Sequence, residues 1–150
     1  MSSPALLVLL LAGTAAATVT DCGVAGQKFT VIEQTFIGVC CKVSPPSDAV
    51  QNVTGKFHST NNDAYEVKWG VDKNEHYCNL TTTSAQGVDP VHKYAGEKYN
   101  KAKDDVETLT RELPAETDVG HEKTVIMFLF CRNKKLKPCH LEVDGLSLEA

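Results

Sequence analysis

Apolar and polar side chains alternate along several short stretches of this chain. The clearest stretch is AYEVKWGV at residues 64–71, where Tyr65, Val67, Trp69 and Val71 occupy every second position and Glu and Lys lie between them. Successive side chains of a β-strand point to opposite faces of a sheet, so this spacing places the four bulky groups on one face. The repeating signal therefore predicts strands and not helices.

Further strands follow from the same reasoning. The period recurs at 51–58 and again at 139–143, while residues 28–40 supply one or two more strands. Residues 124–131 are apolar on both faces, as expected of a central strand that is covered on both sides. The segment 101–116 fits a helix face or a strand face, and we predict a strand there because its threonines favour one.

Turn-forming residues separate these runs. Clusters rich in Pro, Gly, Asn, Asp and Ser lie between the predicted strands. Short strands at even spacing with such turns are typical of an antiparallel sandwich, so the predicted fold class is all-β. The clusters read SPPSD, STNND, VDKNE, AQGVDP and DVGHE.

The amino-terminal residues have the features of a secretory signal peptide. An apolar core runs over residues 5–12, and small residues follow at Ala15 and Ala17, where a signal peptidase would cleave. The core is too short to span a bilayer, which takes roughly 20 apolar residues. We predict a cleaved signal peptide at 1–17 and a single domain at 18–150, secreted to the extracellular space or the endolysosomal lumen.

The cysteine count agrees with that destination. An even number of cysteines in a secreted chain predicts disulfide bonds. The sequons at Asn52 and Asn79 predict a glycoprotein. All six cysteines follow the predicted signal peptide, at Cys22, Cys40, Cys41, Cys78, Cys131 and Cys139.

Signals of catalysis or of metal binding are missing from the sequence. It contains no G-x-S-x-G, no H-E-x-x-H and no phosphate-binding glycine loop, so we predict neither an enzyme nor a bound cofactor. No C-x-x-C spacing occurs, and a zinc site built from Cys40, Cys41, Cys78 and His76 is disfavoured for that reason. The formal net charge of −4 gives no basic field for nucleic acid. The five histidines are interpreted as surface residues: His58, His76, His92, His121 and His140.

One short segment is strongly basic. Arg132, Lys134, Lys135 and Lys137 lie between Cys131 and Cys139, in a loop that joins two predicted strands. One interpretation is a binding surface for anionic head groups or for a receptor. The other is a solvated hairpin loop without a partner.

Several motifs together resemble the ML (lipid-recognition) family, which includes sterol carriers of the Niemann–Pick type C2 kind and the mite group 2 allergens. Its mature chains begin with D-C-G, here Asp21-Cys22-Gly23, and end with a cysteine-containing strand, here Cys139-His140-Leu141-Glu142-Val143. A K-x-G-x-x-Y signature of the family is similar to residues 93–99, with one residue inserted. The apolar strand at 125–130 also stands where the family has one.

This resemblance implies an immunoglobulin-like sandwich of two antiparallel sheets with an apolar cavity between them. It also implies a disulfide from Cys22 to Cys139. A bond between the adjacent Cys40 and Cys41 would close a strained ring. With these two conditions, either Cys40 pairs with Cys78 and Cys41 with Cys131, or Cys40 pairs with Cys131 and Cys41 with Cys78. Adjacent residues of a strand point to opposite faces, so one of the pair would point inward and the other to an edge or loop.

Two functions are compatible with these features. The first is a secreted carrier that binds a lipid, sterol or similar apolar ligand between its sheets, as in sterol transport, where burial of apolar surface drives binding. The second is a cavity-free secreted immunoglobulin-like module that acts through surface contacts with a receptor or immune partner. Core packing explains the candidate cavity residues equally well; they are Phe57, Val67, Trp69, Tyr99, Phe128 and Phe130.

Overall fold

The computed structural model of the protein describes most of the predicted mature chain. The predicted signal peptide, Asn79, and the basic residues Lys134 and Lys135 lie outside the described residues. The described residues contain no helix with the length and apolarity needed to cross a membrane. The described ranges are 19–32, 35–43, 52–73, 75–78, 81–82, 92–100, 105–113, 123–132 and 137–149.

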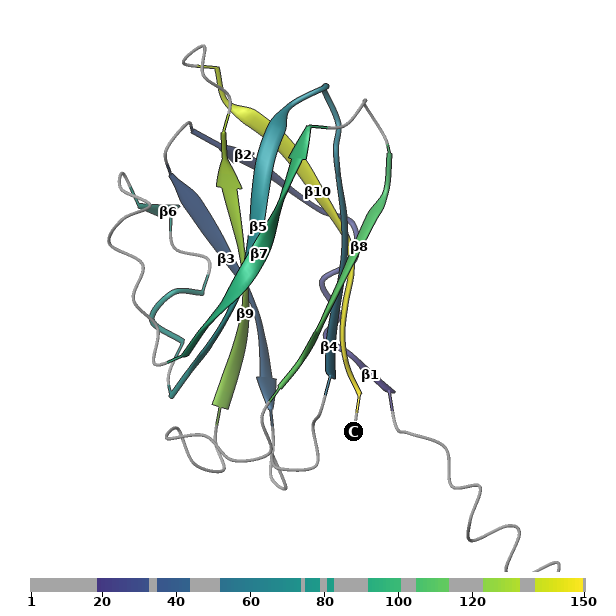
Figure 1. Ribbon diagram of the computed structural model, residues 1–150, viewed down its shortest axis with the longest axis vertical. Helices are drawn as coiled ribbons and strands as arrows, with labels where there is room; N and C mark the ends of the chain where they lie inside the picture. The colour runs from purple at the N-terminus through teal and green to yellow at the C-terminus, as the bar shows by residue number, and fades with distance from the viewer. Residues whose placement is uncertain are drawn as a thin grey trace, which may run out of the picture.

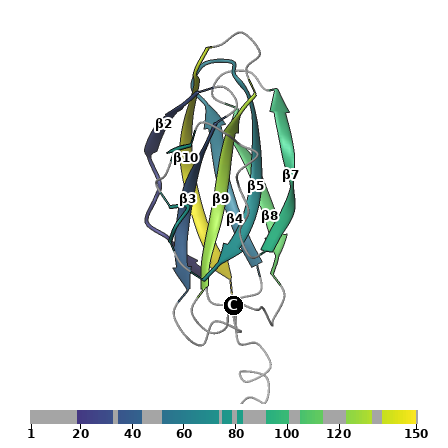
Figure 2. The same ribbon diagram turned by 90° about the vertical axis from the view of Figure 1, so that its left-hand side faces the viewer.

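Two antiparallel sheets pack face to face (Figures 1 and 2). In the first sheet the strand order is β1-β10-β4-β8, with β2 also pairing with β10. In the second sheet it is β6-β3-β9-β5-β7. The predicted all-β antiparallel sandwich is thus confirmed. The first sheet consists of β1 (Val19–Asp21), β2 (Gln27–Val31), β4 (Asn52–Ser59), β8 (Glu107–Glu112) and β10 (Cys139–Glu149). The second consists of β3 (Phe36–Val43), β5 (Ala64–Asp72), β6 (Thr81–Thr82), β7 (His92–Asn100) and β9 (Lys123–Cys131).

The alternating residues meet in one layer between the two sheets, which we call the inner layer. Val67 and Trp69 of β5 face it from the second sheet, and Val53 and Phe57 of β4 face it from the first. All four side chains are buried. Within the ambiguous segment, Glu107–Glu112 form the edge strand β8, which confirms the strand prediction for these residues, and Leu109 enters the same layer.

The central strand β9 is buried along its whole length, as its apolar sequence predicts. Ile126, Phe128 and Phe130 of β9 face away from the inner layer. Together with Phe36 of β3 they form a second apolar group, which we call the outer cluster. The Tyr77 ring packs against this cluster, with its centroid 5.7 Å from that of Phe128. Residues 75–78 therefore lie over the outer cluster of the second sheet.

The turn predicted at STNND, residues 59–63, carries the chain from β4 in the first sheet to β5 in the second. Asn62 adopts a positive φ of 37°, in the left-handed region that Asn tolerates better than most residues. The Ser59 hydroxyl accepts the Asp63 amide at 3.0 Å, and the Asp63 carboxylate accepts the His140 amide at 2.8 Å. These bonds anchor the turn to β10.

The disulfide bonds differ from the pairing that the family resemblance implies. Cys22 pairs with Cys41, not with Cys139, and Cys139 pairs with the nearby Cys131. Of the expected alternatives, only the Cys40–Cys78 bond is present. No cysteine is free. The reason is geometric: residues at the end of β9 and the start of β10 face each other across a short connection, so Cys131 is the nearer partner of Cys139.

The adjacent cysteines use the two faces of β3, as the strand alternation predicts. Cys41 is buried in the inner layer and reaches Cys22, which follows β1 in the first sheet. Cys40 lies beside the outer cluster and bonds Cys78 of the covering segment. One bond therefore joins the two sheets, and the other fastens residues 75–78 over the outer cluster.

Candidate functional site

The inner layer contains most of the residues that the sequence nominates for a ligand cavity. Phe57, Val67, Trp69 and Tyr99 all lie there, and each is no more than 9% exposed. Phe57 comes from the first sheet and the other three from the second, so the group spans the space between the sheets. This part of the sandwich is the candidate site.

Phe128 and Phe130 do not belong to this group. Both lie in the outer cluster, on the face of β9 that points away from the first sheet. The residues of β9 that face inward are Val125, Met127, Leu129 and Cys131. The placement of Phe128 and Phe130 beside a cavity between the sheets is therefore wrong. The error has a physical origin: β9 is apolar at every position, so its sequence does not show which residues face inward.

Three aromatic rings form one end of the candidate site. Tyr65 and Tyr99 are cross-strand partners and stack with centroids 5.2 Å apart. The Phe57 ring meets them edge-on, at 5.9 Å from Tyr65 and 5.1 Å from Tyr99. Such arrangements are favourable for aromatic pairs beyond the area that they bury. This trio makes an aromatic contact that connects the two sheets.

Gly55 marks a tightly packed part of the inner layer. A Cβ atom added there would lie 2.6 Å from Met127 Sδ and 3.0 Å from Trp69 Cη2. Real Cβ atoms do not approach neighbours to 2.6 Å, so the glycine lets the indole and the thioether pack against the backbone of β4. The space beside the far edge of the indole is therefore filled by the protein itself.

Two buried polar atoms in the inner layer have no hydrogen-bond partner in the described part of the chain: the Tyr65 hydroxyl and Trp69 Nε1. Both residues are at most 1% exposed. They lie on the same face of β5, four residues apart, which separates their Cα atoms by roughly 13 Å. An unsatisfied buried polar group costs about 1–3 kcal/mol, so these two atoms are sites where a polar ligand atom would be stabilising.

Burial also controls the ionisation of the two stacked phenols. It raises the pKa of Tyr99 to about 12, with a further contribution from the carboxylates of Glu97 and Glu107, while Arg111 opposes the shift. The pKa of Tyr65 is raised as well, first by burial and then by Glu107. Both phenols remain protonated at neutral pH and keep a hydrogen to donate.

The edge strands β7 and β8 bound the candidate site on one side of the sandwich (Figure 2). Glu97 of β7 pairs with Val67, and Arg111 of β8 pairs with Val53, so both occupy inward-facing positions. Their side chains meet across the two sheets, with Arg111 Nη2 3.7 Å from Glu97 Oε1. Both are partly exposed, which makes this side of the inner layer a polar rim.

The covalent links between the sheets lie along other strands. Cys22–Cys41 connects the residue after β1 to β3, and Cys131–Cys139 connects β9 to β10. Cys41 lies opposite Val125 in the register of β3 with β9. Val125 and Cys131 are six residues apart along β9, or roughly 20 Å. The two bonds thus fasten the sheets at both ends of β9, whereas β7 and β8 carry no cysteine within their described bounds.

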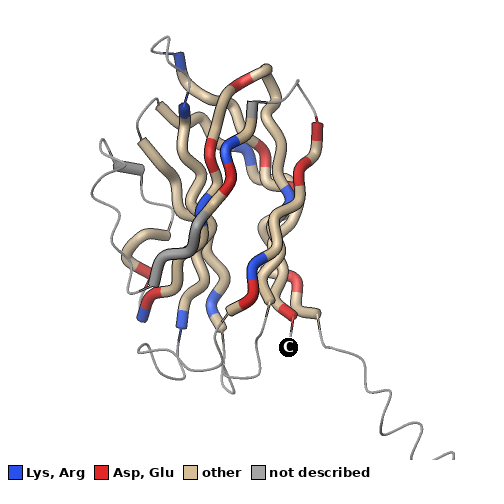
Figure 3. The backbone as a smooth tube through the Cα atoms, in the orientation of Figure 1, with Lys and Arg blue, Asp and Glu red and all other residues tan. Residues whose placement is uncertain are grey.

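The basic loop is constrained at its base. The Cys131–Cys139 disulfide closes it, and Arg132 at its start lies 3.5 Å from the carboxylate of Glu66. Acidic and basic residues are otherwise interleaved along the described strands (Figure 3).

The Asn52 sequon begins β4 at a partly buried position, and the Thr54 hydroxyl of this sequon forms a hydrogen bond with the Thr110 hydroxyl at 2.9 Å.

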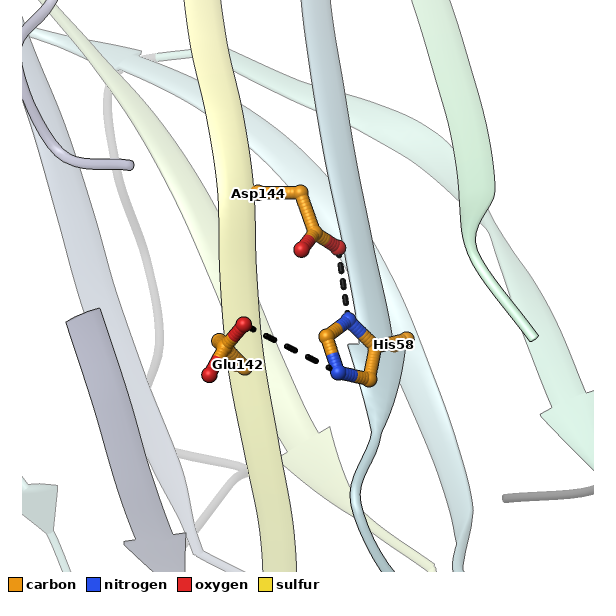
Figure 4. A group of neighbouring side chains, drawn as sticks. All are labelled: His58, Glu142 and Asp144. Atoms are coloured by element: carbon orange, nitrogen blue, oxygen red, sulfur yellow. Dashed lines mark hydrogen bonds and ion pairs between the residues drawn. The ribbon is translucent and has the colours of Figure 1, made fainter. Parts of the chain in front are cut away.

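One histidine does not fit the interpretation of surface residues. His58 is 8% exposed and lies on the outer face of the first sheet between Glu142 and Asp144 (Figure 4). Alternation predicts that His58 and Glu142 face away from the inner layer, but their pairing becomes visible only in the register of β4 with β10. A polar groove of about 200 Å³ adjoins Asp144 and includes Asp21 and Lys56.

Together, the two sheets and three disulfides define a disulfide-linked β-sandwich protein of an oxidising compartment. Comparison of the chain with protein-family models and with curated proteins returns no match. The resemblance to the ML family therefore stays a prediction that rests on the motifs named above.

Proposed function

We propose that the protein is a secreted carrier that binds a lipid, a sterol or a similar apolar ligand between its two sheets. The observation that carries the proposal is the pair of buried polar atoms, Tyr65 hydroxyl and Trp69 Nε1, in an otherwise apolar layer. Ligand pockets of this kind are mostly apolar and contain a few polar groups that fix orientation. An elongated molecule with a polar end fits that description.

The polar end of the ligand meets one of these atoms. Trp69 Nε1 can only donate a hydrogen bond, whereas the Tyr65 hydroxyl can donate or accept. A hydroxyl or carboxyl oxygen satisfies either of them, and both occur at one end of sterols and fatty acids. Burial of the remaining apolar surface contributes about 25 cal/mol per Å², which supplies most of the binding free energy.

The side bounded by β7 and β8 is where such a ligand enters. The disulfides fasten the sheets along β3, β9 and β10, and they leave the ion pair Arg111–Glu97 as a weaker contact at the opposite side. A partly exposed ion pair contributes only about 0–1 kcal/mol. This ion pair therefore adds little to the cost of separating β7 from β8, which the Tyr99–Phe57 contact still opposes, whereas the fastened strands are joined covalently.

Binding of fluorescent probes tests this proposal. Purified protein, extracted with solvent and refolded with its disulfides intact, is titrated with a fluorescent sterol and with a fluorescent fatty acid. The variant Val67→Phe adds four carbon atoms to the inner layer, and Ile126→Phe, as a control, adds three to the outer cluster. We expect at least one probe to bind, with affinity at least tenfold weaker in Val67→Phe and unchanged in Ile126→Phe.

Two results would refute the carrier. One is that neither probe binds to correctly folded wild-type protein. The other is an equal loss of binding in both variants, because that would separate binding from the inner layer. Mass spectrometry of the solvent extract identifies any molecule that is copurified and so narrows the ligand class.

The second candidate, a secreted module that acts through its surface, is favoured by the disulfide that closes the basic loop. A loop held at its base by Cys131–Cys139 presents its charges at lower entropic cost than a free loop. Charge reversal at Lys134 and Lys135 would then abolish capture of a receptor or of anionic vesicles while probe binding stays absent. That combination of results selects the second candidate over the carrier.

A further inference from the structure

Three side chains gather on the outer face of the first sheet, away from the inner layer (Figure 4). His58 of β4 and Glu142 of β10 are cross-strand partners, so they lie directly side by side. Asp144 is the extra residue at a β-bulge, because the register passes from Val143 to Gly145 without pairing it. Bulges re-aim side chains, and this one brings the Asp144 carboxylate to the second nitrogen of the same imidazole.

Each ring nitrogen of His58 faces a different carboxylate. Nδ1 lies 2.7 Å from Asp144 Oδ2, the length of a charge-assisted hydrogen bond. Nε2 lies 3.8 Å from Glu142 Oε2. The other oxygen of that carboxylate, Glu142 Oε1, lies 3.7 Å from Lys28 Nζ. The two oxygens of Glu142 thus have separate neighbours.

The short contact determines the tautomer of a neutral imidazole. When Nδ1–H donates to Asp144, Nε2 becomes the acceptor nitrogen of the ring, with its electron pair in the ring plane. Nε2 of His58 and Oε2 of Glu142 then both present lone pairs, and the two atoms are 3.8 Å apart. A zinc ion binds nitrogen and oxygen ligands at about 2.0–2.2 Å, so one ion bridges this separation in a bent arrangement.

We propose that Nε2 of His58 and Oε2 of Glu142 bind a divalent transition-metal ion such as Zn²⁺. Asp144 acts as a positioning residue: it accepts the Nδ1 hydrogen, as carboxylates commonly do for metal-bound histidines. Water molecules complete the coordination. One imidazole and one carboxylate suit Zn²⁺, Cu²⁺ or Ni²⁺ better than Ca²⁺ or Mg²⁺, which take oxygen ligands.

The local charge is consistent with a cation. The carboxylates of Glu142 and Asp144 carry two negative charges, and Lys28, whose side chain is 75% exposed, carries one positive charge. The imidazole, on β4, lies between two carboxylates of β10 and is largely removed from water, with its side chain 10% exposed. A ligand fixed in this way loses little freedom when it binds the ion.

Titration of the untagged, metal-free protein with Zn²⁺ alone tests the proposal by calorimetry. We expect one ion per chain, with affinity at least tenfold weaker in Glu142→Gln. In Asp144→Asn we expect a loss of about 10–100-fold, the range typical of outer-shell partners of metal-bound histidines. Glu66→Gln is the control, since Glu66 is a carboxylate on the outer face of the other sheet whose side chain is 10% exposed, against 21% for Glu142. The Zn²⁺ affinity of this variant should equal that of the wild type.

Nitrogen chemical shifts of the imidazoles in wild-type protein give a readout that does not depend on any variant. We expect Zn²⁺ to shift Nε2 of His58, while Nδ1 keeps its proton. The proposal is overturned if Zn²⁺ leaves the His58 nitrogens unchanged, if it binds through another histidine, or if folded Glu142→Gln binds as tightly as wild type. Any of these results would leave the three residues as an ion-paired cluster without a metal.

Discussion

Removal of the Cys22–Cys41 bond separates the observed cysteine pairing from the one that the family resemblance implies. The variant Cys22→Ala/Cys41→Ala deletes both partners of a bond that joins the two sheets. In the observed pairing, Cys40–Cys78 and Cys131–Cys139 remain intact. The protein should therefore still fold, but with a less constrained unfolded state.

The expected loss of stability follows from the length of chain that the bond closes. For a sequence separation of 19, the chain-entropy relation gives about 3 kcal/mol at 25 °C. Cys41 is only 7% exposed, so loss of its sulfur from the inner layer adds to this value. The separation of 8 in Cys131–Cys139 gives about 2.5 kcal/mol, so removal of that pair should be less costly.

Urea unfolding of the wild type and of Cys22→Ala/Cys41→Ala measures the loss of stability. A loss of about 3 kcal/mol moves the urea midpoint by about 1–3 M for the slopes usual in small domains. The fluorescence of the chain's single tryptophan reports unfolding of the inner layer. A midpoint shift well below that range would contradict the entropic argument.

Thiol counting on the unfolded, unreduced variants tests the pairing itself. The observed pairing predicts no free thiol in Cys22→Ala/Cys41→Ala and two in the matched control Cys22→Ala/Cys139→Ala. The pairing of Cys22 with Cys139 predicts the reverse. Two thiols in the first variant and none in the second would refute the structural assignment.

Three further predictions concern the inner layer. Gly55→Ala should destabilise the protein by about 1–2 kcal/mol, because overpacking against Met127 outweighs the smaller entropic gain of alanine; equal or greater stability in urea would show loose packing there. Tyr65→Phe should stabilise the ligand-free protein by about 1–2 kcal/mol, since it deletes a buried hydroxyl that has no partner, and an unchanged urea midpoint would argue against this. The pKa of Tyr99 is raised from 10.0 to about 12, so between these values the native state keeps a proton that the unfolded chain releases. The free energy of unfolding should therefore be fully present below pH 10. It should fall between pH 10 and 12 by at most about 1.4 kcal/mol per pH unit. If the free energy of unfolding falls no more steeply with pH in the wild type than in Tyr99→Phe, that last expectation is contradicted.

The alternating stretches were predictable because a strand with one buried face repeats every two residues. Tyr65, Val67 and Trp69 occupy that face as expected, and β8 forms where threonines outweigh an ambiguous leucine spacing. The same rule cannot tell which residues of β9 face inward, because both faces of that strand are apolar. Phe128 and Phe130 were therefore assigned to the wrong face.

The candidate site was predictable in part for the same reason. Sequence alone locates the inner-layer residues Phe57, Val67, Trp69 and Tyr99 of the alternating strands. The unpartnered state of the Tyr65 hydroxyl and Trp69 Nε1 depends on every neighbour in three dimensions. The contact between Arg111 and Glu97 needs both sheets in place. The cluster at His58 further depends on a bulge that sequence periodicity does not reveal.

Cys40 and Cys41 show most clearly which features follow from sequence and which need the fold. Their adjacency on a strand sends them to opposite faces, and ring strain prevents their direct bond, so both needed distant partners. Which partners they take was decided by tertiary structure alone. The packing of β1 against β10 places Cys22 beneath β3, and the segment 75–78 brings Cys78 over the outer cluster. A disulfide forms only between sulfurs that the fold brings within bonding distance, and that proximity is a property of the whole sandwich.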